Sequence, residues 1–522
     1  MKLENKIYVI AILLVIVATS CFKDEGNYAY NEIGDITVSN METSYLAYSY
    51  VGDVLKISPL VETAYADMKY EWYIWKGTGS SFIVDESQEQ EMELIGEEKD
   101  LSYEVNLEPD DYTLLFKATS ETNGFAAMQT ATLEVSTRFL RGFYILKETA
   151  DGNTELDLHY QDGMPLIENV LETTGQSPLS GAPLAMGTVY MQGYIDEESN
   201  TVETCNSIFV TTDAKNLRFY NSEDMSVIHD NTDIAYGGLE GDVVPYIAYT
   251  ADNLYNHLLT NKGLYTVMNG AMGMPSSAYA YAAGGGKGGS LFATPCWTSI
   301  FGMDINVTLL WDEQNHSINC WDSYGFFTPN ENGFSMEGMT CLMCGFTKSN
   351  SKAYLLCENE QGDRCLFEIG VDDMAYQLVI EQKIDLQASF RLAQSNLFTV
   401  NADNASYLYY IYDNKLYAYS LANNTELETP FYLDGIAADE EIVYLSYQSV
   451  NCFADAEAGT NFTHLMVGTQ KDDTYHLYMY NIAGGEPQAL VRTITGTGTL
   501  KSVAYVTPRF DPTTDTASYP NS

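Results

Sequence analysis

Short apolar segments separated by turns run through the first part of the chain. Residues 28–137 contain DITVS, VLKISPLVE, MKYEWYIW, LSYEVNL, DYTLLFKATS and TATLEVST. Within the fifth segment, period-two alternation assigns one set of side chains to a core face, namely Tyr112, Leu114, Phe116 and Ala118. This spacing is typical of a small β-sandwich, and Trp72 is predicted to be its central core residue.

A second pattern recurs from Gly142 onward. Segments made of a strand, a polar turn and a second strand ending in an aromatic residue begin at positions 142, 207, 253, 290, 352, 407 and 464. Their mean spacing of about 54 residues is close to that of propeller blades. One blade cannot bury both of its faces, so the ring must close, and TLKSVAYV at 499–506 is predicted to complete the first blade. The sequence therefore predicts a β-propeller of six to eight blades, with seven favoured.

Composition supports an all-β fold. The 522 residues include 40 Tyr and 21 Phe, which suit half-buried pleated faces, and 45% of the chain is hydrophobic, which argues against disorder. The formal net charge of −47 repels nucleic acid and anionic lipid, so neither is expected as a partner. The acidity is otherwise interpreted as a solubility feature.

The N-terminus has the features of an export signal. Lys2 and Lys6 precede an apolar run from Ile7 to Ala18, which is too short to span a bilayer as a helix. Thr19 and Ser20 then lead to Cys21, a sequence that resembles the bacterial lipobox, in which the cysteine is acylated after cleavage. Removal of residues 1–20 takes away two Lys and one Glu, so −47 becomes −48.

The residues after Cys21 bear on where the protein is displayed. The sequence FKDE at 22–25 resembles the surface-export signal of Bacteroidetes lipoproteins, which implies the outer membrane and an outward face. A solvated acidic tether is the other interpretation. We expect a signal peptide at 1–20, a lipidated tether at 21–35, an Ig/PKD-like β-sandwich at 36–138, a β-propeller at 139–510 and a C-terminal tail at 511–522.

Several motifs together resemble the PKD-like lipoproteins of Bacteroidetes. They are YEWYIW, LEPDDYTLLFKATSETNGF, the join FLRGFYILKETADGNTELDL, and SPLSGAPLAM at 177–186. The resemblance implies an N-terminal immunoglobulin-like PKD domain followed by a propeller-like domain. It also implies an accessory role beside outer-membrane transporter pairs of the starch-utilisation type, which import glycans or peptides.

Eight cysteines remain after Cys21, and disulfides are permitted outside the cytoplasm. Cys357 and Cys365 flank the turn-like stretch ENEQGDR, so they are the predicted disulfide pair. Cys341 and Cys344 supply two more thiols, but the seven residues between Cys357 and Cys365 do not match a zinc knuckle. No metal site and no cofactor are predicted, and plain buried thiols are the alternative to a disulfide.

No catalytic motif is recognisable. The glycine-rich AAGGGKGGS at 282–290 lacks the spacing of a phosphate-binding loop, because Tyr281 and Gly288 occupy the positions of the first Gly and the Ser or Thr. The six histidines form no close ligand pair, and no G-x-S-x-G elbow is present. Paired carboxylates of a glycosidase cannot be identified from sequence, since their spacing is spatial.

Aromatic residues gather around the fourth repeated segment. Three of them, Tyr281, Trp297 and Tyr324, fall in predicted loops and are the ligand-binding candidates, because loops carry function and aromatic rings stack on sugars or apolar groups. Core packing is the alternative for any strand aromatic.

Taken together, the sequence predicts a non-catalytic binding or accessory lipoprotein for glycan or peptide capture. Two other classes stay open. A propeller-borne extracellular hydrolase or lyase would place convergent His, Asp or Glu side chains at the centre of the ring. A structural or adhesive surface protein would have a flat face without aromatic residues.

Overall fold

The computed structural model describes residues 35–507 except for 50–53, 78–91, 161, 240, 251–254, 282–291, 294–295, 299–303, 323–324, 348–349, 373–376, 401–405 and 449–462. The predicted signal peptide and Cys21 therefore lie outside the described residues. Internal contacts divide the chain into two compact units, Met1–Val135 and Ser136–Ser522. Among the residues that the structure describes, no helix is long and apolar enough to cross a membrane.

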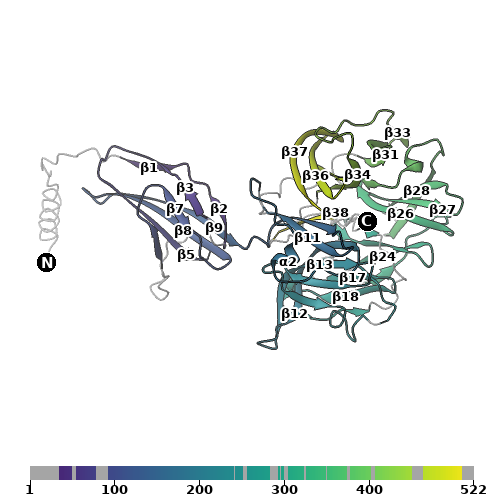
Figure 1. Ribbon diagram of the computed structural model, residues 1–522, viewed down its shortest axis with the longest axis horizontal. Coiled ribbons are helices and arrows are strands. Elements are labelled where there is room, and N and C mark those ends of the chain that lie inside the picture. The colour runs from purple at the N-terminus through teal and green to yellow at the C-terminus, as the bar shows by residue number, and fades with distance from the viewer. Residues whose placement is uncertain are drawn as a thin grey trace, which may run out of the picture. The chain divides into compact units, whose positions relative to one another are not determined.

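The first unit is a β-sandwich built from antiparallel sheets (Figure 1). Its larger sheet has the order β2-β9-β8-β5-β6, and its smaller pairs are β1-β4 and β3-β7. The strands are β1 (Ile36–Ser39), β2 (Ser44–Tyr48), β3 (Val54–Ile57), β4 (Leu60–Thr63), β5 (Met68–Lys76), β6 (Glu93–Gly96), β7 (Leu101–Glu104), β8 (Asp110–Ser120) and β9 (Ala126–Ser136). The predicted Ig-like sandwich is confirmed.

Trp72 is at the centre of the sandwich core, as predicted. Its side chain is fully buried, its ring lies 4.6 Å from that of Phe116, and its Nε1 donates to the Glu98 carbonyl at 3.1 Å. The predicted core face of β8 belongs to the same apolar cluster. Burial of a Trp and a Phe removes hundreds of square ångströms from water, so this one cluster supplies most of the driving force of the unit.

The second unit is a propeller of seven antiparallel sheets within the described residues (Figure 1). Six sheets have four strands in chain order, with one two-stranded insertion. The strands are β12 (Pro183–Ile195), β13 (Val202–Thr212), β14 (Leu217–Asn221), β15 (Val227–Asp230); β16 (Pro245–Thr250), β17 (Tyr255–Thr260), β18 (Gly263–Met268), β19 (Ala280–Tyr281); β20 (Phe292–Ala293), β23 (Thr308–Asp312), β24 (Ser317–Asp322), β25 (Gly325–Phe327), with β21 (Cys296–Thr298) and β22 (Asp304–Asn306) inserted; β26 (Met339–Thr347), β27 (Lys352–Asn359), β28 (Arg364–Asp372), β29 (Gln377–Asp385); β30 (Phe398–Val400), β31 (Tyr407–Tyr412), β32 (Lys415–Ser420), β33 (Thr425–Glu426); and β34 (Glu441–Tyr447), β35 (His464–Lys471), β36 (Thr474–Ala483), β37 (Glu486–Thr497).

The seventh sheet closes the ring with strands from both ends of the unit. Its order is β11-β10-β38, in which β38 (Thr499–Val506) pairs antiparallel with β10 (Gly142–Glu148), and β10 pairs with β11 (Thr154–His159). The prediction that TLKSVAYV completes the first blade is confirmed. The first strands of neighbouring sheets pack together, β12 on β16, β26 on β30, β30 on β34, β34 on β38 and β38 on β12, so they line the inside of the ring.

The closing blade has no regular fourth strand in the described residues. Two isolated bridges, Leu158 with Ile167 and Thr154 with Leu179, cover the outer edge of β11 instead. Between these bridges lies the short helix α2 (Val170–Thr173). Elsewhere in the described residues, the 3-10 turns are η1 (Gly270–Met272) and η2 (Leu392–Gln394). This irregular outer edge leaves room for polar groups beside β11.

Six of the seven predicted repeats correspond to the middle of a blade, while the segment that begins at 290 contains the strands from β20 to β24. The segments that begin at 142, 207, 253, 352, 407 and 464 contain the second and third strands, for example β27 and β28 or β35 and β36. These hairpins have tight polar turns between aromatic-rich strands, which made them visible in the sequence. In the five four-stranded blades among these, the inner strand precedes the segment and was not recognised as part of the repeat, whereas the inner strand of the closing blade is the predicted β38.

Candidate ligand-binding site

A polar pocket of about 280 Å³ lies beside the closing blade. Its walls come from the β10–β11 turn, from α2, and from Asp473 and Thr497, which lie where β35 and β37 end. In an antiparallel blade, the turn between the second and third strands and the link to the next blade lie at the same end. The pocket therefore opens on the face of the ring where these connections gather, and rigidly held connections of this kind carry binding groups.

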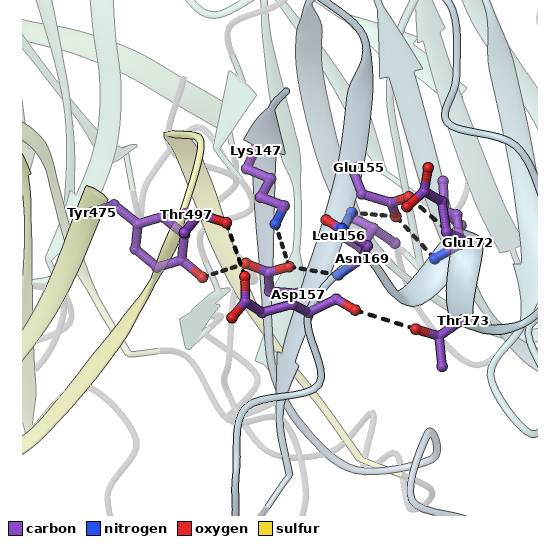
Figure 2. A network of polar contacts seen from close by, with 11 residues as sticks. Lys147, Glu155, Leu156, Asp157, Asn169, Glu172, Thr173, Tyr475 and Thr497 are labelled. Carbon is purple, nitrogen blue, oxygen red and sulfur yellow. Dashed lines mark hydrogen bonds and ion pairs between the residues drawn. The ribbon is translucent and has the colours of Figure 1, made fainter. Parts of the chain in front are cut away.

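The carboxylate of Asp157 is the centre of the polar network in Figure 2. Lys147 Nζ lies 2.6 Å from Asp157 Oδ1, and both side chains are buried. The Tyr475 hydroxyl donates to Asp157 Oδ2 at 2.6 Å, and the Asn169 N–H donates to Oδ1 at 2.8 Å. Because Tyr475 stands on β36, the network joins strands separated by 318 residues.

Glu155 holds the neighbouring helix. Its Oε1 accepts the N–H groups of Leu156 and Leu171, both at 2.8 Å, and its Oε2 accepts the N–H of Glu172 at 3.3 Å. The N–H groups of a helix's first turn have no acceptor inside the helix, so a carboxylate placed there satisfies them. Glu155 therefore fixes α2 against β11.

Burial governs the protonation of this network. It raises the pKa of Asp157 and of Glu155, although Lys147 and the donated N–H groups act in the opposite direction. Burial and the nearby Asp157 charge also raise the pKa of Tyr475 far above its ordinary value. Tyr475 consequently stays a hydrogen-bond donor at neutral pH, as the geometry requires.

The accessible rim of the pocket is acidic. Asp151, Glu172 and Asp473 are exposed lining residues, whereas Lys147, the sole Lys or Arg among the described lining residues, is bound to Asp157. A ligand therefore meets hydrogen-bond acceptors and negative charge at the mouth. Such a site suits neutral polar groups or cations and repels anions.

Two surface contacts tie the closing blade to the preceding one near this pocket. The Thr497 hydroxyl donates to Glu168 Oε2 at 2.8 Å. Arg492 donates to both oxygens of Asp162, at 2.7 and 2.8 Å, and its guanidinium lies 4.9 Å above the Phe143 ring. The Arg492 hydrogen bonds are the main reason that the pKa of Asp162 falls to about 2.

Among the three aromatic candidates, Tyr281 is described with its side chain, and it does not line this pocket. Tyr281 ends β19, is 50% exposed, packs edge-on against Tyr265 at 5.4 Å and donates to the Lys262 carbonyl at 3.3 Å. Trp297 lies on the inserted strand β21, opposite Ile305, and its side chain is outside the described residues, as is Tyr324. Their role as ligand-binding residues stays a prediction.

The structure describes both cysteines of the predicted disulfide. Cys357 and Cys365 face each other directly in the β27–β28 hairpin, and both are buried free thiols in this structure. Their disulfide stays a prediction. Within the described part of the chain, no group of three or more His, Cys, Asp or Glu side chains is arranged to hold a metal ion.

Sequence reasoning missed Lys147, Glu155 and Asp157. The only available signal was the alternation ELDLH at 155–159, which indicates one apolar and one polar face. An alternating strand ordinarily exposes its polar face to solvent. Here that face is covered by β36, which alternation alone cannot reveal.

Comparison with known proteins gives a family for the N-terminal part. Residues 21–183 contain a PKD-like family domain, a match that runs through the sandwich and into the first strand of the propeller's first four-stranded blade. A search of curated proteins found no match.

Solved structures with a similar fold are distant in sequence. A quinonprotein alcohol dehydrogenase-like protein from Bacteroides thetaiotaomicron is 10% identical with a TM-score of 0.38, covering 91% of this chain and 99% of its own. The Dos1 propeller is 9% identical with a TM-score of 0.35, covering 69% and 87%. The WD40 β-propeller domain of Doa1 is 11% identical with a TM-score of 0.29, covering 63% and 89%. The propeller assignment itself rests on the seven sheets described above.

Proposed function

We propose that this chain is a surface-exposed outer-membrane lipoprotein that captures a glycan or peptide, without catalysis, for a transporter pair of the starch-utilisation type. The observation that carries the binding role is the polar pocket beside the closing blade. Its lining includes Lys147, Glu155 and Asn169 from the polar network, and its rim presents acidic side chains.

The network gives the pocket a fixed shape. Asp157 and Glu155 are each held by two or more donors, so neither can turn toward a reacting group without leaving a buried charge unpaired. A rigid floor with an accessible polar rim favours reversible binding, since preorganised groups lose little entropy when a ligand arrives. Polyhydroxylated sugars and peptide amides both supply N–H and O–H donors for the rim carboxylates of Asp151, Glu172 and Asp473.

The lipid anchor is the second part of the proposal. Cys21 follows an apolar run of signal-peptide length, and the PKD-like domain begins at the same residue. Along the chain, the sandwich separates this lipidated end from the propeller and its pocket.

Replacing Cys21 by Ala tests the anchor. We expect the variant to lose incorporation of a fatty-acid probe and to leave the membrane fraction, because one thiol carries the acyl group. Cys205→Ala, at a buried thiol of the propeller, is the matched control and should keep the label. A Cys21→Ala chain that is still labelled and membrane-bound would contradict the lipoprotein proposal.

A screen of the detergent-solubilised full chain against glycans and peptides tests the ligand class. We expect hits among neutral or basic compounds and none among polyanions such as sulfated glycans, because the rim is acidic. Binding confined to polyanions would overturn the proposed site.

A further inference from the structure

The blade formed by β26–β29 gathers thiols on one face. Cys341, Cys357 and Cys365 are buried in one apolar cluster, against which Cys344 packs as a half-buried side chain. These residues come from three adjacent strands, with Cys341 opposite Cys357 and Cys357 opposite Cys365.

A β-bulge puts Cys344 on the same face as Cys341. Residues three apart on a regular strand point to opposite faces. Here the register shifts between Cys341 and Met343, so the strand gains one extra residue, Leu342. Leu342 and Met343 consequently pack into the cluster on the other face of the blade, while Cys341 and Cys344 share theirs.

The bulge brings these two thiols into contact. Cys341 Sγ lies 3.8 Å from Cys344 Sγ, and it also donates to the Met343 carbonyl at 3.3 Å. A sulfur–sulfur bond requires a closer approach of about 2.0 Å, which side-chain rotation within a bulge can supply. The two sulfur atoms are therefore already in contact in the folded chain.

Cys344 is also reachable. It lines a small cavity of about 20 Å³ together with residues of β30 and β34, which are inner strands of the next two blades. The cavity therefore lies on the inside of the ring. A small reagent can reach Cys344 there, and Cys344 is also open to reagents before the fold is complete. Cys341 is buried.

We propose that Cys341 and Cys344 form an intrastrand disulfide in the exported protein, an inference that rests on the export part of the proposed function. The Cys344 thiolate attacks the disulfide of an oxidant, either a dithiol–disulfide exchange protein or a small-molecule disulfide of the envelope. The Cys341 thiolate then displaces the second oxidant sulfur. Two protons and two electrons pass to the oxidant, which leaves as two thiols, and one sulfur–sulfur bond forms in the protein.

Burial raises the pKa of the Cys341 thiol in the folded chain, and the hydrogen bond with Cys341 together with burial raises the pKa of Cys344. A protonated thiol is a poor nucleophile, so the bond forms while the blade is still assembling. The oxidation therefore takes place in the compartment where the exported chain folds.

Peptide mapping of the full chain from cell envelopes tests the pair. Thiols are blocked with iodoacetamide in denaturant before any reduction, and the protein is digested with trypsin and Glu-C. Cleavage after Glu337 and Lys348 isolates Cys341 with Cys344, whereas separate peptides, 353–358 and 365–368, carry Cys357 and Cys365. We expect an unblocked 338–348 peptide that is lighter by two hydrogen atoms and is not joined to either of the peptides that carry Cys357 and Cys365.

Variants and alternative links complete the test. Cys344→Ser should leave Cys341 blocked by iodoacetamide, while Cys365→Ser should leave the looped peptide unchanged. A 338–348 peptide with both thiols blocked, or one joined to 353–358 or to 365–368, would overturn the proposal. Fatty-acid labelling of the same chain reports export separately, so a labelled but reduced chain defeats the disulfide and leaves the lipoprotein proposal standing.

Discussion

The closing blade and the blade of β26–β29 use the same two middle strands in opposite ways. In β27 and β28, both faces are apolar, with Leu355 and Phe367 in one cluster and Leu356 and Leu366 in another. In β10 and β11, one face is apolar, but the other buries Lys147, Glu155 and Asp157.

The difference follows from what each blade must join. A blade made from consecutive strands needs only hydrophobic packing, which is strong and tolerant of small shifts. The closing blade must bring β38 and β36 against strands that lie more than three hundred residues earlier. Buried polar groups that have to be satisfied together permit one arrangement of these strands, and we infer that they fix the register of closure.

The largest expected effect comes from breaking the buried pair. Asp157→Leu leaves the Lys147 ammonium buried without a partner and should lower the free energy of unfolding of the propeller by about 3–5 kcal/mol. Denaturant titration followed by Tyr fluorescence measures the loss.

The matched control removes both charges. Lys147→Met combined with Asp157→Leu should lose less than Asp157→Leu alone, because no unpaired charge remains. If the double variant is as unstable as the single one, the polar closure described here is wrong.

An apolar cavity in the other blade should cost slightly less and behave differently. Leu366 is fully buried, so Leu366→Ala should lower the free energy of unfolding by about 2–4 kcal/mol, by the same amount at pH 5 and pH 8. The same titration at both pH values checks it. Val491→Ala, at a 44% exposed side chain, is the control and should stay within about 0.5 kcal/mol of the parent. If the loss in free energy of unfolding caused by Leu366→Ala depended strongly on pH, this would contradict the contrast between an apolar blade and a blade with buried charges.

The smallest expected effect concerns the exposed ion pair between Asp162 and Arg492, which joins the closing blade to the preceding one. Arg492 holds the pKa of Asp162 at about 2, below its value of 3.8 in an unfolded chain. A depressed carboxyl pKa stabilises the folded state above pH 3.8, and that contribution is lost as the pH falls toward 2. Because Asp162 is 63% exposed, solvent screening keeps the contribution below about 1 kcal/mol.

Melting temperatures of the parent and of Asp162→Asn, measured from pH 6 to pH 2, check this prediction. The parent should melt higher at pH 6, and the two curves should converge near pH 2. A difference in melting temperature that is constant across this range would show that the Asp162–Arg492 pair acts through packing rather than charge.

Sequence patterns predicted the sheets well and the site poorly, for one physical reason. The alternation of β8 and the repeated hairpins are local properties, since adjacent residues decide which face is apolar. What covers a face is not local. Asp157 meets Tyr475, and Asp162 meets Arg492, across 318 and 330 residues respectively.

The candidate site shows the same limit of sequence patterns, because residues that are far apart in the sequence form it. Tyr281 was selected because it is aromatic and near a loop, and it is indeed exposed, but the pocket lies elsewhere on residues that look ordinary in sequence. Asp151, Glu172 and Asp473 become a rim only when the last four-stranded blade is placed beside the closing blade.

Titration of the strongest glycan or peptide hit against a rim variant tests the central claim most directly. Asp151→Asn, Glu172→Gln and Asp473→Asn together keep side-chain size and leave the Asp157 network intact. Each lost charge-assisted contact is worth about 1 kcal/mol, so the dissociation constant should rise at least about tenfold, while Glu197→Gln, an exposed residue between β12 and β13, changes nothing. Equal affinity of the parent and the rim variant would contradict the assignment of this pocket as the binding site.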